Sequence, residues 1–153
     1  MSTPGVAASG WRVLPALSAA CHLLVSLAAA AVLVWSLSLV VDDLSSHTDE
    51  FDGLAVLFGG MISAVALLVG SASVLLLVLT GRATAGAPGG FLGSGFGAVV
   101  LGALGTFVSF GFLHLASGHN RPLIVAVLLF SVGYAGVGAA LVAVHGRAGP
   151  SRV

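Results

Sequence analysis

Four long stretches without a charged side chain divide the sequence and constrain what it can fold into. They cover residues 13–41, 53–81, 83–120 and 122–146. An α-helix needs about 20 apolar residues to cross the roughly 30 Å hydrocarbon layer of a bilayer, so each stretch is long enough for one crossing and too short for two. The stretches are continuous, without the alternation of period two that a membrane β-barrel needs. We therefore expect helices near residues 14–41, 53–80, 91–116 and 122–144.

The composition excludes the common soluble classes. Hydrophobic residues make up 58% of the chain and charged residues 7%, and the mean hydropathy is +1.16. An ordinary soluble domain carries about 25% charged residues. The chain has no Lys and a formal net charge of zero, so it offers no polybasic patch for nucleic acid or lipid phosphates. We expect an all-α integral membrane protein, a bundle of four transmembrane helices in which residues 1–153 form a single membrane domain.

The links between the predicted helices set their orientation. Residues 81–90 (GRATAGAPGG) are rich in Gly and Pro, and residues 117–122 (SGHNRP) are short enough for a tight hairpin. With four crossings, both termini share a side with the 81–90 link. That side carries four of the five basic residues, which are Arg12, Arg82, Arg147 and Arg152, and the other side carries Arg121. The positive-inside rule then predicts cytoplasmic termini, with residues 1–11 and 146–153 as flexible tails.

The source membrane follows from residue usage rather than from physics. The basic residues are all Arg, and Ala, Gly and Val are abundant, which is typical of a GC-rich genome. We therefore predict the plasma (inner) membrane of a bacterium.

Small residues recur along one face of the third predicted helix, at spacings of three or four. They are Ser94, Ala98, Gly102, Gly105 and Ser109. Lipid gives helices no hydrophobic reason to associate, so close backbone approach across small residues drives their packing. The second helix offers Ser63, Ala66, Gly70 and Ser73, and the fourth offers Ser131, Ala135 and Gly138. These faces are expected to pack within one monomer or against another subunit.

His22 is a polar residue inside the first apolar stretch, on one helix face with Ser18 and Ser26. An ionisable group inside a membrane is a candidate proton relay, haem ligand or substrate contact. No predicted helix contains a carboxylate partner, so we favour a neutral histidine that hydrogen-bonds locally and holds helices together. A haem with two axial histidines needs both at similar depth, which His22, His114 and His145 do not provide. We expect no cofactor.

The acidic residues are concentrated in one loop that is predicted to face outward. Carboxylates and imidazoles ligate metal ions, and the candidate ligands are Asp42, Asp43, His47, Asp49, Asp52, His114 and His119. The acidic spacing does not follow an EF-hand. We favour a solvated loop in which the acidic residues, Glu50 included, stabilise the start of the second helix, with no metal bound.

The sequence offers no case for catalysis. The segment Gly93–Ala98 matches the G-x-G-x-x-A pattern, but no strand precedes it and no acidic residue follows it. We predict a small non-enzymatic membrane protein with a structural or accessory role, in contact with lipid and with other membrane subunits or a second copy. The alternatives are a homo-oligomeric transporter or channel for a neutral solute, and a protein that binds metal on its outer face.

Overall fold

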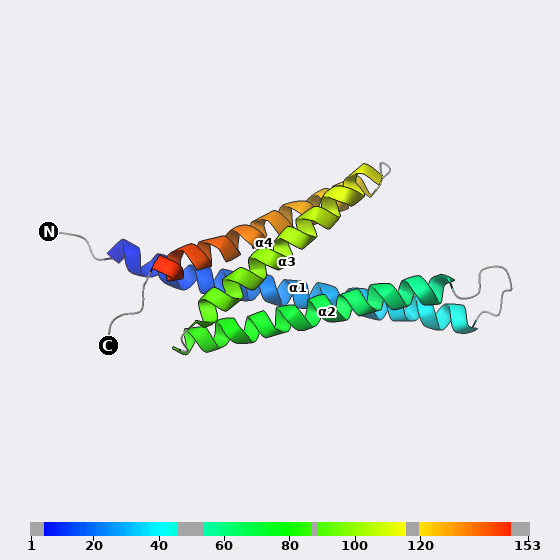
Figure 1. The fold of residues 1–153 in the computed structure, drawn as a ribbon, viewed down its shortest axis with the longest axis horizontal. Coiled ribbons are helices and arrows are strands. Elements are labelled where there is room, and N and C mark those ends of the chain that lie inside the picture. The colour runs from blue at the N-terminus through cyan, green and yellow to red at the C-terminus, as the bar shows by residue number, and fades with distance from the viewer. Residues whose placement is uncertain (1–4, 46–53, 87–88, 116–119, 148–153) are drawn as a thin grey trace. The chain divides into compact units, whose positions relative to one another are not determined.

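The computed structural model describes residues 5–45, 54–86, 89–115 and 120–147. These residues form four α-helices: α1 (Gly5–Ser45), α2 (Leu54–Thr84), α3 (Gly90–Leu115) and α4 (Arg121–Arg147) (Figure 1). Each helix contains a stretch long and apolar enough to cross a membrane. The prediction of an all-helical chain with four helices of membrane length is confirmed.

The helices extend beyond the predicted apolar cores. α1 begins at Gly5 rather than near residue 14, and α4 continues to Arg147 rather than residue 144. Part of the segment expected as a flexible amino-terminal tail is therefore helical. The apolar pattern locates the part of a helix that needs lipid, whereas hydrogen bonding continues past it into polar surroundings. Pro15 lies inside α1, near the predicted start, although proline removes one helical hydrogen bond.

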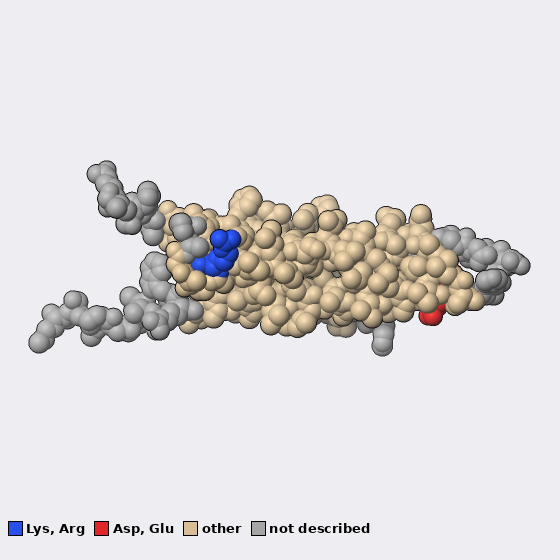
Figure 2. Space-filling model, turned by 90° about the horizontal axis from the view of Figure 1, so that it is seen from below, with Lys and Arg blue, Asp and Glu red and all other residues tan. Residues whose placement is uncertain are grey.

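Burial is inverted relative to a soluble protein. Apart from Leu141, the fully buried residues are small or polar, and they include Ser18, His22, Ser36, Ser73 and Ser94. Most large apolar side chains lie outside; Phe107 is 80% exposed and Leu68 is 72% exposed. On the face that Figure 2 shows, most of the described surface carries no charged side chain. A surface of this kind is stable when lipid rather than water surrounds it.

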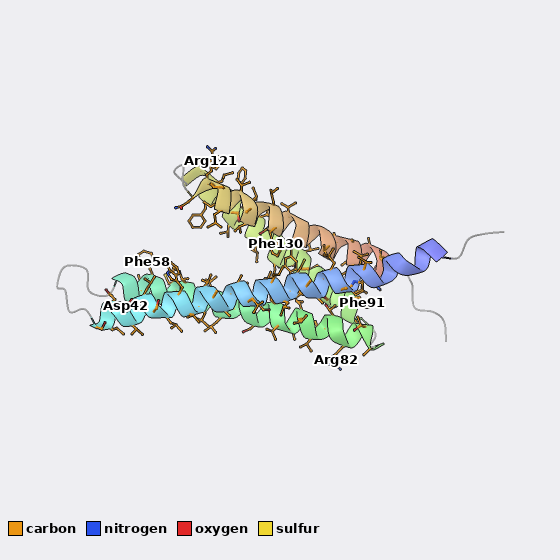
Figure 3. The ribbon with its side chains drawn as sticks, turned by 180° about the vertical axis from the view of Figure 1, so that it is seen from behind. Asp42, Phe58, Arg82, Phe91, Arg121 and Phe130 are labelled. Atoms are coloured by element: carbon orange, nitrogen blue, oxygen red, sulfur yellow. The ribbon has the colours of Figure 1, made fainter. Side chains whose placement is uncertain are left out.

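Apart from Arg12, which lies within α1, the charged residues of the described segments are in the first or last turn of a helix. Asp42 is in the last turn of α1, Arg82 is in the last turn of α2, and Arg121 is the first residue of α4 (Figure 3). These positions place the charges beyond the apolar part of each helix, where water and lipid headgroups can solvate them.

The chain divides into two compact units, of which the first described here is His22–Leu75. It is an antiparallel pair made from α1 after Cys21 and α2 before Leu76. Buried residues recur every seven positions on both helices: His22, Ala29 and Ser36 on α1, and Gly59, Ala66 and Ser73 on α2. This period places the buried residues along one narrow seam of each helix.

The other unit comprises Met1–Cys21 and Leu76–Val153. Its main element is the antiparallel hairpin of α3 and α4. The end of α2 joins α3 through a turn in which Gly86 and Gly89 have φ values of 95° and 78°. Backbone in this left-handed region strains residues with a Cβ, so glycine at both positions allows the chain to reverse within a few residues.

Candidate functional site

The predicted small-residue face of α3 is turned inward over most of its length. Ser94 and Ala98 are fully buried, Gly102 and Ser109 are buried, and Gly105 is half-buried. The face is shared between two neighbours, because Gly102 and Gly105 contact α4 whereas Ser94 contacts the end of α2. Ser94, Ala98, Gly102 and Gly105 therefore belong to helix contacts inside one unit, and Ser109 is buried on the same face.

The backbones of α3 and α4 touch at two places. A Cβ added to Gly102 would lie 2.7 Å from the backbone nitrogen of Ala135 and 2.7 Å from the carbonyl oxygen of Ser131. A Cβ added to Gly138 would lie 2.5 Å from the carbonyl oxygen of Gly95. Real Cβ atoms do not approach backbone this closely, so only glycine permits this separation of the two helices.

Gly95 was not singled out as a packing residue from the sequence. It lies seven positions before Gly102, two helical turns away and on the same side of α3. That spacing is a signal of helix packing that the sequence carries, in the same segment as the G-x-G-x-x-A pattern. Which glycine meets a backbone and which meets open space depends on the neighbouring helix.

Two pairs of hydroxyl groups join neighbouring helices. The Ser36 and Ser63 Oγ atoms lie 2.7 Å apart between α1 and α2, and the Thr80 Oγ1 and Ser94 Oγ atoms lie 2.5 Å apart between α2 and α3. Ser36 also donates to the Leu33 carbonyl at 3.0 Å, and Thr80 to the Leu76 carbonyl at 2.9 Å. Since a hydroxyl has one proton, Ser63 donates to Ser36, whereas either hydroxyl of the Thr80–Ser94 pair can be the donor.

The predicted intramembrane polar residues lie on the inner side of α1. Ser18 and His22 are fully buried, and Ser26 is half-buried. The Ser26 hydroxyl donates to the His22 carbonyl oxygen at 2.8 Å, one turn back along the same helix. This bond satisfies the Ser26 proton without a partner from another helix.

Two aromatic rings, one from α3 and one from α4, contact each other at the open end of the α3–α4 hairpin. The Phe91 and His145 ring centroids are 4.3 Å apart, and His145 Nδ1 lies 3.0 Å from the Leu141 carbonyl oxygen. A carbonyl accepts only, so Nδ1 carries the proton and donates it. The ring thus packs over the first turn of α3 as a structural contact.

The predicted metal ligands are only partly within the described segments. Asp42 and Asp43 lie in the last turn of α1, and His114 is exposed near the end of α3, with its ring edge-on to Phe110 at 5.2 Å. The other candidates, His47, Asp49, Asp52 and His119, lie outside the described residues, as does Glu50. Among the residues that the structure describes, no three His, Cys, Asp or Glu side chains gather to hold a metal ion.

One shallow hollow opens on the α3–α4 hairpin. Its lining is Ala103, Thr106, Phe107, Phe110, Val132 and Ala135. The Thr106 hydroxyl donates to the Gly102 carbonyl at 2.8 Å, and the other lining side chains are apolar. It lacks the convergent polar groups that orient a specific ligand.

Comparisons with known proteins assign no family to this chain. The chain matches no protein-family model, no curated protein and no solved structure.

Proposed function

We propose that this chain is a small multi-pass membrane protein with a non-catalytic, structural or accessory role in a membrane assembly. The observation that carries the proposal is the contact of α3 with α4. At Gly102 and Gly138 the two backbones approach so closely that even a methyl group would strike backbone atoms. Between these two helices there is no width for a water-filled path, so the hairpin acts as a rigid packing element.

The treatment of polar groups supports the same role. The hydroxyls of Ser36, Ser63, Thr80 and Ser94 are used in bonds that join helices. Charged side chains are absent from the apolar parts of all four described helices, whereas ion and proton pathways usually contain them. The partners we infer are lipid together with other membrane subunits or a second copy of the chain.

The cellular setting is part of the proposal. Four Arg residues on the side of the termini against one on the other support cytoplasmic termini. Arg-only basic residues and abundant Ala, Gly and Val support the plasma membrane of a bacterium.

The test is purification from native membranes in mild detergent, with a tag after Val153, followed by native mass spectrometry. An accessory role predicts reproducible recovery with other membrane subunits, whose identities would name the process. Recovery only as a monomer or homo-oligomer would contradict it. His22→Leu serves as the matched variant, because a structural role leaves the partner set unchanged when this side chain is replaced.

A transporter or channel for a neutral solute is the second candidate, and the complete burial of His22 favours it. A buried imidazole inside the membrane is a candidate contact for a polar solute. Liposomes containing the purified protein should then swell in glycerol faster than empty liposomes, and His22→Leu should abolish the difference. Equal swelling with and without the protein would count against this second function for glycerol.

A further inference from the structure

The Ser73 hydroxyl stands out among the buried polar groups of the His22–Leu75 unit. Ser73 is fully buried, and its Oγ has no hydrogen-bond partner among the residues that the structure describes. Serine and threonine inside helices commonly bond to the carbonyl four residues back, as Ser26 and Thr80 do here. Ser73 does not, so its hydroxyl remains available within a packed, apolar environment.

The register of α1 against α2 places Ser73 at the level of a second polar group. Ser36 bonds to Ser63, and a Cβ at Gly70 would lie 3.3 Å from the Ala29 Cβ. Moving seven residues toward the amino terminus of α1 therefore corresponds to moving seven residues toward the carboxyl terminus of α2. Three further steps bring Ser73 level with Ser26. Side chains on a helix lean toward its amino terminus, which turns Ser73 toward the Ala29–Ser26 turn of α1.

The two hydroxyls have complementary remaining capacity. The Ser26 hydroxyl donates its one hydrogen bond to the His22 carbonyl oxygen at 2.8 Å. Its oxygen can therefore only accept further hydrogen bonds. Ser73 has an unused proton. A molecule that accepts a hydrogen bond from Ser73 and donates one to Ser26 would satisfy the remaining hydrogen-bonding capacity of both hydroxyls. Water is a small molecule that can do both.

We propose that the Ser26–Ser73 level of the α1–α2 pair is a binding site for a single buried water molecule. The water accepts a hydrogen bond from the Ser73 hydroxyl and donates one to the Ser26 oxygen. Buried waters occur where polar groups would otherwise be unsatisfied, and inside a bilayer no bulk water can take that place. The site links the two helices at a level where they share no direct side-chain hydrogen bond among the bonds described above.

The first test uses the wild-type chain in lipid nanodiscs, so that it does not depend on a variant that folds. Magnetisation transfer from water protons is measured by NMR at the Ser73 side chain and at the Ala66 methyl group. Ala66 is buried two turns away on the same face and has no hydroxyl. Transfer at Ser73 and none at Ala66 is expected. Absence of transfer at Ser73 would overturn the proposal.

The second test depends on the sign of a stability change. Ser73→Ala removes one oxygen and leaves the remaining side chain in place, and Ser71→Ala makes the same change at an exposed position of α2. If water is bound, Ser73→Ala lowers the Tm below that of Ser71→Ala and removes the water signal. An unchanged or higher Tm for Ser73→Ala overturns the proposal, because deleting an unsatisfied buried hydroxyl is neutral or stabilising.

Discussion

At the scale of single residues, the position of a glycine decides whether it can be replaced. Gly102 and Gly111 are on the same helix, but a Cβ at Gly102 would strike the backbone of α4, whereas one at Gly111 meets nothing within 4 Å. We expect Gly102→Ala to destabilise the protein by about 1–3 kcal/mol, the usual cost of overpacking. Gly111→Ala should be neutral or stabilising by up to about 1 kcal/mol, because alanine is the better helix former.

Thermal unfolding of both variants in the same detergent checks this pair. Gly111 is the matched control, because the substitution and the helix are identical and only the neighbouring helix differs. Equal stability of the two variants would mean that α3 and α4 do not meet at Gly102 as described.

The hydroxyl pair of Ser36 and Ser63 gives a second prediction at this scale. Their Oγ atoms are 2.7 Å apart inside the α1–α2 pair. Hydrogen bonds between transmembrane helices contribute about 0.6 kcal/mol on average, less than an apolar environment would suggest. A double-mutant cycle of Ser36→Ala and Ser63→Ala should give a coupling energy of about that size. Strictly additive losses would show that the two hydroxyls do not interact.

At the scale of helices, each packed face is narrow and distinct from the lipid-facing surface. Ala66 and Ala64 are two positions apart on α2; Ala66 is buried with the seam residues, and Ala64 is exposed. Ala66→Leu should force α1 and α2 apart and cost about 1–3 kcal/mol. Ala64→Leu should change stability little, since its larger side chain extends into lipid. Comparison of the two unfolding midpoints measures the difference directly.

The extents of the helices show which part of an element a sequence pattern reveals. The charge-free stretches located all four apolar cores, because a single charge in hydrocarbon is costly enough to leave a clear gap in the pattern. They did not locate the start of α1 at Gly5, because no comparable cost marks the end of a helix in a polar environment.

At the scale of the whole molecule, the arginine distribution predicts which loops face the cytoplasm. In a Cys21→Ser background, Thr48→Cys should react with a membrane-impermeant maleimide in intact cells. Ala85→Cys should react only after the membrane is broken, because the 81–90 link is expected to share the arginine-rich side with both termini. The opposite labelling pattern would invert the proposed topology, and equal labelling of both in intact cells would contradict four crossings.

The sequence by itself determined the class of the molecule: four helices of membrane length, with no charged residue in their apolar cores. It also indicated the inward faces, since small residues at spacings of three and four mark the sides on which α2, α3 and α4 are buried. These properties depend on local chemistry, on the cost of a charge in lipid and on the helical repeat, so they can be obtained from one chain without its neighbours.

Only the tertiary structure decided what each inward residue meets. Gly102 lies against backbone and Gly111 in open space, Ser94 bonds to Thr80 of α2, and Ser73 is left without a protein partner among the described residues. The sequence could not distinguish these cases, because each depends on the register and separation of two helices. Register is a property of a pair, fixed by the fit of both faces together, and neither helix carries it alone.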